Sequence, residues 1–408
     1  MVAPKKSRLL ATAFPYLQIF SVFSLTPPPQ SFDHTSPHKR LRWYLMAGFV
    51  CYAAGILVMV LFVSYVNIIA IHKEILDYHV ADFTSVMGNI QKGLYSVMAI
   101  ANQLNMVFNY RRLGRIYEDV ASLEWDIDEA SQCFGGQKQR YSFRFRLAFS
   151  VGVWFILLLI LVPKFTLLSL GIYISWTCKI ITEFVIVMQQ LKSVEYCVFV
   201  QMIHELVLRL RHTLLKLQED LEVCEQQDML QALCVALKRN QLLLGRLWRL
   251  QCEVASYFSL PMMLLFLYNG LTILHMVNWA YINTFLDNDC CRYDRFFICC
   301  FLLINLLMPC LLSQRCINAY NCFPRILHKI RCLSAASDFP ILTRGLREYS
   351  LQMQHLKLLF TCGGLFDINL KYFGGMLVTI MGYIIILIQF KIQAIAENKY
   401  KSSLNISV

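Results

Sequence analysis

Residues 43–66 read WYLMAGFVCYAAGILVMVLFVSYV and contain no charged side chain. About 20 apolar residues in a helix cross the roughly 30 Å hydrocarbon core of a bilayer. We therefore expect residues 43–66 to span a membrane. The whole chain fits this environment, because 57% of its 408 residues are hydrophobic and only 16% are charged. A soluble globular protein has about 45–50% apolar and about 25% charged residues, so the composition excludes a soluble enzyme.

Six further apolar stretches are long enough to be membrane spans. They cover residues 82–107, 146–163, 166–190, 254–281, 296–314 and 372–392. The 82–107 stretch is the weakest of them because several amides and Lys92 interrupt it. The Pro163-Lys164 turn makes 146–163 and 166–190 a tight helical hairpin. The sequence predicts an all-α membrane protein with seven transmembrane helices.

Lysine and arginine accumulate in cytoplasmic loops, so their distribution predicts the orientation. The amino-terminal segment and the connections between spans 2 and 3, 4 and 5, and 6 and 7 carry 29 of them, against seven on the other face. We expect a cytoplasmic amino terminus and an extracellular carboxyl terminus. Topology thus accounts for the net charge of +12, and we expect no nucleic-acid partner. A G-protein-coupled receptor has the opposite orientation, and the chain lacks its DRY and NPxxY motifs.

Two connections are too long to be simple loops. Apolar residues recur at helical spacing in 191–251 and again in 320–371, which predicts long cytoplasmic helical extensions. These helices could pack within one chain or between subunits. No glycine-rich phosphate loop, H-E-x-x-H or G-x-S-x-G motif occurs, and none of the 16 cysteines forms a C-x-x-C pair. We therefore expect no enzyme, no metal and no cofactor.

The predicted boundaries divide the chain into five parts. They are a cytoplasmic amino-terminal segment (1–42), six spans with their cytoplasmic helices (43–319), further cytoplasmic helices (320–371), the last span (372–392) and an extracellular tail (393–408). Within the first part, residues 8–25 are amphipathic. They could form an interfacial helix or a disordered leader.

The carboxyl-terminal region carries the most specific pattern. Residues 363–367 read GGLFD and residues 382–390 read GYIIILIQF. This resembles the insect gustatory receptor family, whose last span carries Thr-Tyr, five apolar residues and Gln-Phe after a GLF-acid-hydrophobic segment. One departure is Gly382, which stands where the family usually has threonine. Outside this region the resemblance rests on length, seven spans and topology, which insect odorant receptors share.

The resemblance implies a ligand-gated cation channel that needs no G protein, in the plasma membrane of gustatory receptor neurons. It implies homo- or heterotetramers with the seventh helices around a pore, a tastant pocket in the outer half of each bundle, and contact with membrane lipid. The sugar-sensing branch typically has an acidic residue after the motif tyrosine. Ile384 stands there, so we expect bitter or aversive ligands, with contact pheromones still open. The alternatives are an odorant receptor subunit and a secondary transporter.

The resemblance places Gln389 and Phe390 near the gate, where a polar side chain replaces hydration and an apolar ring closes the pore. Ile386 lies one turn earlier on a similar face. Tyr383 is expected to support packing near the gate. Alternatively, Gln389 hydrogen-bonds a neighbouring helix.

Binding pockets are mostly apolar and aromatic with a few polar groups. Seven pocket candidates lie in the outer halves of the spans: Trp154, Tyr173, Trp176, Tyr268, His275, Asn278 and Trp279. Each could instead belong to an interfacial aromatic belt or the helix core.

Charges within spans usually face a cavity or a partner. Three are predicted here: Lys92, Lys179 and Glu183. Lys179 and Glu183 are four residues apart and could pair on one helix face. Asn405 begins a glycosylation sequon on the predicted extracellular side.

Overall fold

The computed structural model describes residues 7–29, 39–78, 82–132, 142–160, 174–223, 227–283, 292–332 and 339–406. Almost all of them are helical. The elements are α1 (Arg8–Val22), α2 (Lys39–Tyr78), α3 (Asp82–Gln132), α4 (Ser142–Leu147), the π-helix η2 (Ala148–Gly152), α6 (Trp176–Val223), α7 (Gln227–Asn283), α8 (Arg292–Tyr320), α9 (Phe323–Arg331), α11 (Pro340–His355), β1 (Thr361–Cys362), β2 (Phe366–Asp367) and α12 (Leu370–Ile406).

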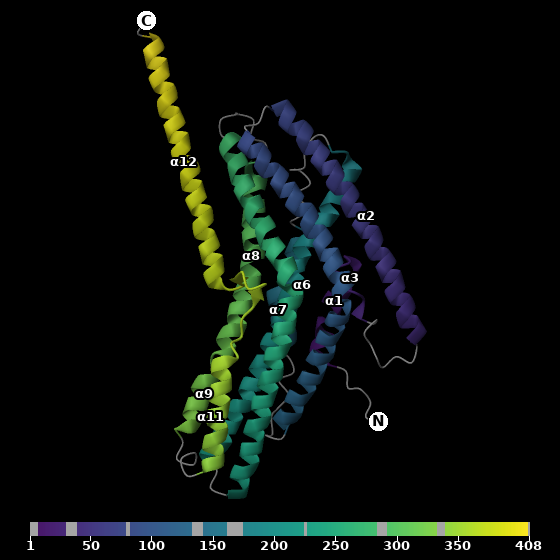
Figure 1. Ribbon diagram of the computed structural model, residues 1–408, viewed down its shortest axis with the longest axis vertical. Coiled ribbons are helices and arrows are strands. Elements are labelled where there is room, and N and C mark those ends of the chain that lie inside the picture. The colour runs from purple at the N-terminus through teal and green to yellow at the C-terminus, as the bar shows by residue number, and fades with distance from the viewer. Residues whose placement is uncertain are drawn as a thin grey trace.

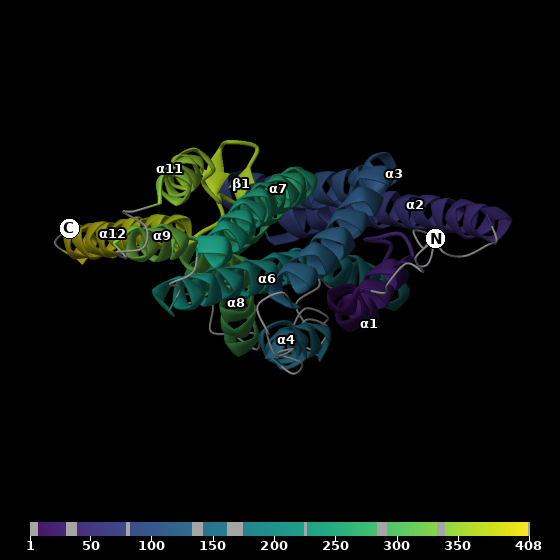
Figure 2. The same ribbon diagram turned by 90° about the horizontal axis from the view of Figure 1, so that it is seen from below.

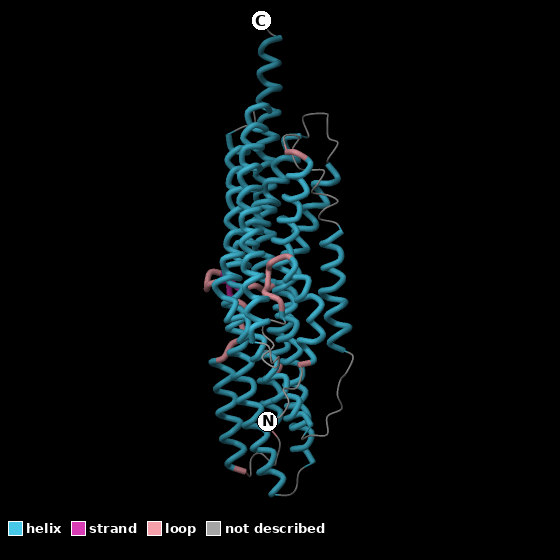
Figure 3. The backbone as a smooth tube through the Cα atoms, turned by 90° about the vertical axis from the view of Figure 1, so that its right-hand side faces the viewer, coloured by secondary structure: helices cyan, strands magenta, loops and turns pink. Residues whose placement is uncertain are grey.

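The molecule is an elongated bundle whose long helices run roughly along one axis (Figure 1). Seen from below, α6 lies between α7 and α8 (Figure 2), and every side chain from Val187 to Ile203 is buried. The helix α12 stands beside the upper half of the bundle, and its carboxyl-terminal end projects past the rest (Figure 3). The short helices α9 and α11 lie at the opposite end.

Five helical segments in the described residues are long and apolar enough to cross a membrane. They are Trp43–Ala70, Phe143–Ile160, Asp228–Asn278, Arg295–Arg331 and Leu370–Phe390. The predicted span 82–107 lies in α3. The predicted span 166–190 lies in α6 from Trp176 onward. These two helices are more polar because they turn glutamines such as Gln91, Gln189 and Gln190 into the protein interior. A helix surrounded by other helices does not need an apolar face for lipid.

The amino-terminal segment is a helix. Ser7 caps it by accepting a hydrogen bond from the Leu10 backbone N–H, as an N-cap serine typically does. Leu9, Leu17 and Phe20 are fully buried where α1 packs on α3 and α6. The amino-terminal segment is therefore a helix rather than a disordered leader, and it packs against the bundle.

The predicted helical extensions are present and pack on one another within the chain. The Asn240 side-chain amide of α7 donates to the Leu210 carbonyl of α6 at 3.3 Å. The Tyr349 hydroxyl of α11 donates to Asn240 Oδ1 at 2.7 Å. An exposed ion pair, Lys238 with Glu348 at 3.0 Å, joins α7 to α11. The connection 320–371 thus packs against the connection 191–251.

A two-stranded antiparallel hairpin, which the apolar pattern of the sequence does not predict, connects this end to α12. Gly363 and Gly364 have φ of 58° and 76°, a backbone conformation that favours glycine, and the Leu365 N–H donates to the Cys362 carbonyl across the turn. The Phe366 ring then stacks on Tyr372 with centroids 4.1 Å apart. The GGLFD segment thus forms a tight turn and contributes Phe366 to a ring stack.

The start of α12 is capped by Asn369, whose Oδ1 accepts from the Tyr372 N–H at 2.8 Å. Asparagine is among the strongest N-cap residues. The helix continues to Ile406, so the segment predicted as a tail from residue 393 is helical up to that point.

Candidate functional site

The last helix is the least covered of the five apolar segments. Only 11% of its most apolar window is buried, compared with 56% in α7 and 50% in α8. Gln389 is exposed, and the side chains of Ile386 and Phe390 are 50% and 63% exposed. Within the described residues, these three predicted pore residues therefore all have exposed side chains on α12.

Tyr383 behaves differently from its neighbours on α12. It is half-buried, and its hydroxyl donates to the Met87 sulfur of α3 at 3.6 Å. Sulfur is a weak acceptor, so this contact positions the tyrosine more than it stabilises the fold. Tyr383 thus links α12 to α3.

A cluster of polar side chains lies where α3, α6 and α7 meet. The Gln91 amide donates to the Thr272 hydroxyl at 3.0 Å, and Thr272 also hydrogen-bonds Tyr268. The Tyr268 ring lies 6.1 Å from the Tyr95 ring. Glu183, only 4% exposed, is within electrostatic range of both tyrosines. We call these five residues the upper polar cluster.

Two more of the predicted residues lie beside the upper polar cluster. His275 is 8% exposed and within electrostatic range of Lys92. Lys92 of α3 follows Gln91 directly, and His275 of α7 lies one turn after Thr272. The structure thus brings together Lys92, Glu183, Tyr268 and His275, which the sequence alone places on three separate spans.

A second polar layer links four helical segments. The side-chain amides of Gln190 in α6 and Asn269 in α7 hydrogen-bond each other in both directions, at 2.9 and 3.1 Å. Asn305 of α8 donates to the Gln190 carbonyl oxygen and accepts from Ser193 Oγ at 2.7 Å. The Trp154 indole N–H donates to the same Asn305 oxygen at 3.2 Å. Trp154 therefore takes part in helix–helix contact as a buried hydrogen-bond donor.

The other pocket and charge candidates lie at various positions along the helices. Trp176 is 67% exposed at the start of α6, and Asn278 is buried near the end of α7. Lys179 is partly exposed one turn before Glu183. Tyr173 lies outside the described residues, as do the side chains of Trp279 and Asn405.

Sequence reasoning missed Gln91, Tyr95 and Thr272 as site residues, although a signal existed. Polar residues recur at helical spacing within the apolar stretch of α7, at Tyr268, Thr272 and His275. Spacings of three and four residues place side chains on one helix face. An apolar span with one polar stripe is typical of a helix that faces a polar site inside a bundle.

The polar clusters offer hydrogen-bond donors, acceptors and opposite charges in an otherwise apolar environment. Such a combination of groups is typical of those that contact a small organic molecule with a few polar groups. Across the described ranges, no group of three or more His, Cys, Asp or Glu side chains is placed to hold a metal ion.

Comparisons with known proteins agree with this architecture. The family model described as 7tm chemosensory receptor matches residues 13–394. Gustatory receptor 98b of Drosophila melanogaster is 73% identical, over 99% of this chain and all of that protein. Gustatory receptor 98c of the same fly is 50% identical over 98% of both chains.

Solved structures with a similar fold include the olfactory receptor OR5 of the insect Machilis hrabei. It aligns with a TM-score of 0.62 at 13% identity over 92% of this chain and 98% of that chain. The same receptor in complex with eugenol aligns with a TM-score of 0.64 at 14% identity, over 93% and 98%. The chain belongs to the seven-transmembrane chemosensory receptor family, as a member of its insect gustatory receptors.

Proposed function

We propose that this chain is a subunit of a ligand-gated, non-selective cation channel that detects tastants at the plasma membrane of gustatory receptor neurons. The observation that carries the proposal is the exposure of α12. This helix is apolar and mostly uncovered within one chain, yet it presents Gln389 among its exposed residues. Four such helices around an axis would cover one another and enclose a polar path.

The proposed assembly is a homo- or heterotetramer with the amino terminus in the cytoplasm. Residues 43–319 then form the ligand-binding bundle with its cytoplasmic helices, residues 320–371 complete the cytoplasmic anchor, and residues 372–392 line the pore. The excess of lysine and arginine on one face supports this orientation. It places Asn405 outside the cell, where its sequon could be glycosylated.

In this proposal Gln389, Phe390 and Ile386 line or close the pore, and Tyr383 holds their helix against α3. A filter must offer polar groups in place of water, and apolar rings close a pore by excluding water. The exposure of the first three side chains and the Tyr383 contact with Met87 support this division of roles.

The ligand is proposed to bind at the upper polar cluster, next to Lys92 and His275. The eugenol complex of the similarly folded olfactory receptor supports a small organic ligand. Ile384 in place of an acidic residue supports a bitter or aversive compound rather than a sugar. Lys92 and Glu183 would give the site opposite charges near its aromatic rings.

The test is whole-cell current in cells that express this chain, alone and with other gustatory receptor subunits. Bitter compounds and sugars are applied in turn. We expect a current that rises within milliseconds without a G protein. Gln389→Ala and Phe390→Ala are expected to change the leak current or the half-maximal ligand concentration severalfold, with surface expression unchanged.

The matched control for Phe390→Ala is Phe62→Ala, because Phe62 is 54% exposed on α2, a helix that lies away from α12 (Figure 1). It removes the same ring from another membrane-facing helix and should leave the current unchanged. Identical currents in wild type, Gln389→Ala and Phe390→Ala would contradict the pore assignment. Substrate uptake without current would favour a transporter instead.

A further inference from the structure

A groove separates α7 from α12 on the surface of the chain. Its volume is about 670 Å³, within the range of about 300–1,000 Å³ typical of ligand pockets. Gly270 and Leu274 of α7 form one side, and residues from Asp367 to Ile380 form the other. Neither polar cluster described above contributes to its lining.

Two glycines leave this groove open. A Cβ atom added at Gly270 or at Gly375 would meet no atom within 4 Å. In membrane helix pairs, glycines usually allow the two backbones to touch, but here they widen the space between α7 and α12. A groove on the surface of a membrane-spanning protein is filled by the molecules that surround it.

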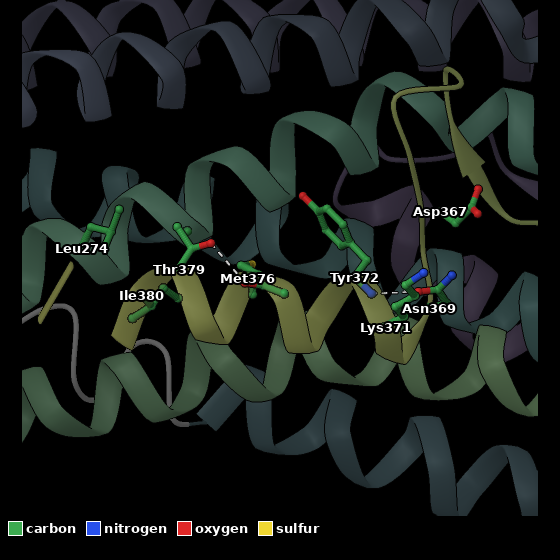
Figure 4. A pocket seen from close by; sticks show the side chains of 10 residues that line it. Leu274, Asp367, Asn369, Lys371, Tyr372, Met376, Thr379 and Ile380 are labelled. Atoms are coloured by element: carbon green, nitrogen blue, oxygen red, sulfur yellow. Dashed lines mark hydrogen bonds between the residues drawn. The ribbon is translucent and has the colours of Figure 1, made fainter. Parts of the chain in front are cut away.

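The lining changes from polar to apolar along the groove. Figure 4 shows Asp367, Asn369 and Lys371 at one end, and Met376, Thr379, Ile380 and Leu274 towards the other. The Thr379 hydroxyl donates to the Gly375 carbonyl of its own helix at 3.1 Å, so its hydrogen is already used. The apolar span of α12 begins at Leu370, so the polar end lies at the membrane–water boundary. The apolar end extends into the hydrocarbon region. This is the polarity profile of one lipid molecule.

The polar end carries two opposite charges. Within the part of the chain that the structure describes, neither the Asp367 carboxylate nor the Lys371 ammonium hydrogen-bonds or pairs with another side chain. Lysine is a common ligand of phosphate groups. A carboxylate accepts hydrogen bonds from a primary ammonium, whereas a choline headgroup has no N–H to donate.

We propose that the groove binds a phospholipid with an ethanolamine headgroup. Lys371 holds the phosphate, Asp367 accepts from the primary ammonium, and one acyl chain lies along Met376 and Ile380. The bound lipid fills the gap between α7 and α12. This site does not depend on channel activity, because it requires only that α12 enters the membrane at Leu370.

The experiment measures lipid retention by the full chain. The protein is reconstituted in nanodiscs made of equal parts phosphatidylcholine and phosphatidylethanolamine, extracted, and examined by native mass spectrometry. Wild type is expected to retain phosphatidylethanolamine preferentially. Asp367→Asn should lose this preference while still binding both lipids. Lys371→Gln should retain about tenfold less of either, which corresponds to the loss of one charge-assisted hydrogen bond.

Gly375→Leu fills the groove and should release the lipid. Its control is Gly55→Leu on α2, where an added Cβ also meets no atom, and this variant should retain lipid as wild type does. If Gly375→Leu fails to give a monodisperse protein, Lys371→Gln still tests the lipid site, because Lys371 is exposed and its replacement leaves the packing unchanged.

Three results would overturn the proposal. One is equal retention of the two lipids by wild type, and another is unchanged retention in Lys371→Gln. The third is displacement of the lipid by free phosphoethanolamine at the same concentration as intact lipid, since the acyl chain would then contribute nothing.

Discussion

Lys192 and Glu195 are a buried ion pair on α6, below the predicted span 166–190. Their charged atoms are 2.7 Å apart, and the side chains are 1% and 0% exposed. The Lys192 ammonium also lies 5.4 and 5.2 Å from the ring centroids of Tyr257 and Phe258 on α7, within range of cation–π attraction. Burial raises the pKa of Glu195, and Lys192 opposes that shift.

Removing one partner of a buried pair leaves a charge without compensation, which typically costs about 3–5 kcal/mol. We therefore expect Lys192→Met to lower the melting temperature of the purified protein strongly. The double variant Lys192→Met/Glu195→Gln should recover much of the loss. Because the isolated Glu195 has a raised pKa when folded, the single variant should regain stability as the pH falls and the carboxyl is protonated.

Thermal melts across a pH series measure this effect. Lys238→Met is the control, because Lys238 forms an exposed ion pair with Glu348, and exposed pairs contribute only about 0–1 kcal/mol. If Lys192→Met melts like Lys238→Met at every pH, the buried pair does not stabilise this fold.

At the scale of the element, two prolines interrupt long helices. Pro261 lies within α7 and Pro309 within α8. A proline has no N–H, so the carbonyl four residues earlier loses its partner in the helix. Those carbonyls belong to Tyr257 and Asn305, and neighbouring helices supply the missing donors. Asn105 of α3 donates to the Tyr257 carbonyl at 3.3 Å. The single Ser193 hydroxyl hydrogen of α6 is shared between Asn305 Oδ1 at 2.7 Å and the Asn305 carbonyl at 3.3 Å.

A double-mutant cycle tests this compensation. Asn105→Ala leaves the buried Tyr257 carbonyl without a donor and should cost about 1–3 kcal/mol. In a Pro261→Ala background the new N–H at position 261 can bond that carbonyl. The same Asn105→Ala substitution should then cost much less. Equal costs in both backgrounds, measured by thermal melts, would mean that Asn105 stabilises the protein by another route.

The helices that coincide with long apolar runs were predictable from the sequence. Residues 43–66, 254–281, 296–314 and 372–392 all lie inside observed helices, because a run that long has one favourable environment. The π-helix at Ala148–Gly152 and the hairpin before α12 were not predicted. Both depend on local backbone geometry that hydropathy does not encode.

The candidate site was only partly predictable. Glu183 and Lys92 were recognised because a charge in an apolar run is conspicuous. Their neighbours Tyr95 and Thr272 were not, since such residues are ordinary in a helix until another helix is known to face them. Lys192 was likewise not predicted to be buried, because it belongs to the basic connection 191–251. In the structure its side chain is buried where α6 contacts α7.

For the whole molecule, the position of α12 bears on how chains assemble. The helices α2 and α12 lie on opposite sides of the bundle (Figure 1), and both expose large apolar residues. Of these two helices, only α12 meets its own copies under the proposed assembly, whereas α2 faces lipid. The exposed fraction of a side chain within one chain does not distinguish a helix that contacts another copy from a helix that contacts lipid. A measurement of the distance to a second copy does.

Cysteine cross-linking separates them. Helices packed in a membrane are about 8–10 Å apart axis to axis, and a disulfide joins residues whose Cα atoms are within about 7 Å. Ile386→Cys should therefore give disulfide-linked dimers on oxidation in the membrane. Val58→Cys, at a position 66% exposed on α2, should add nothing to the background of wild type, which already carries an exposed Cys51. Cross-linking from α2 alone would place the contact between copies on that helix and leave α12 facing lipid, which is incompatible with a pore at Gln389.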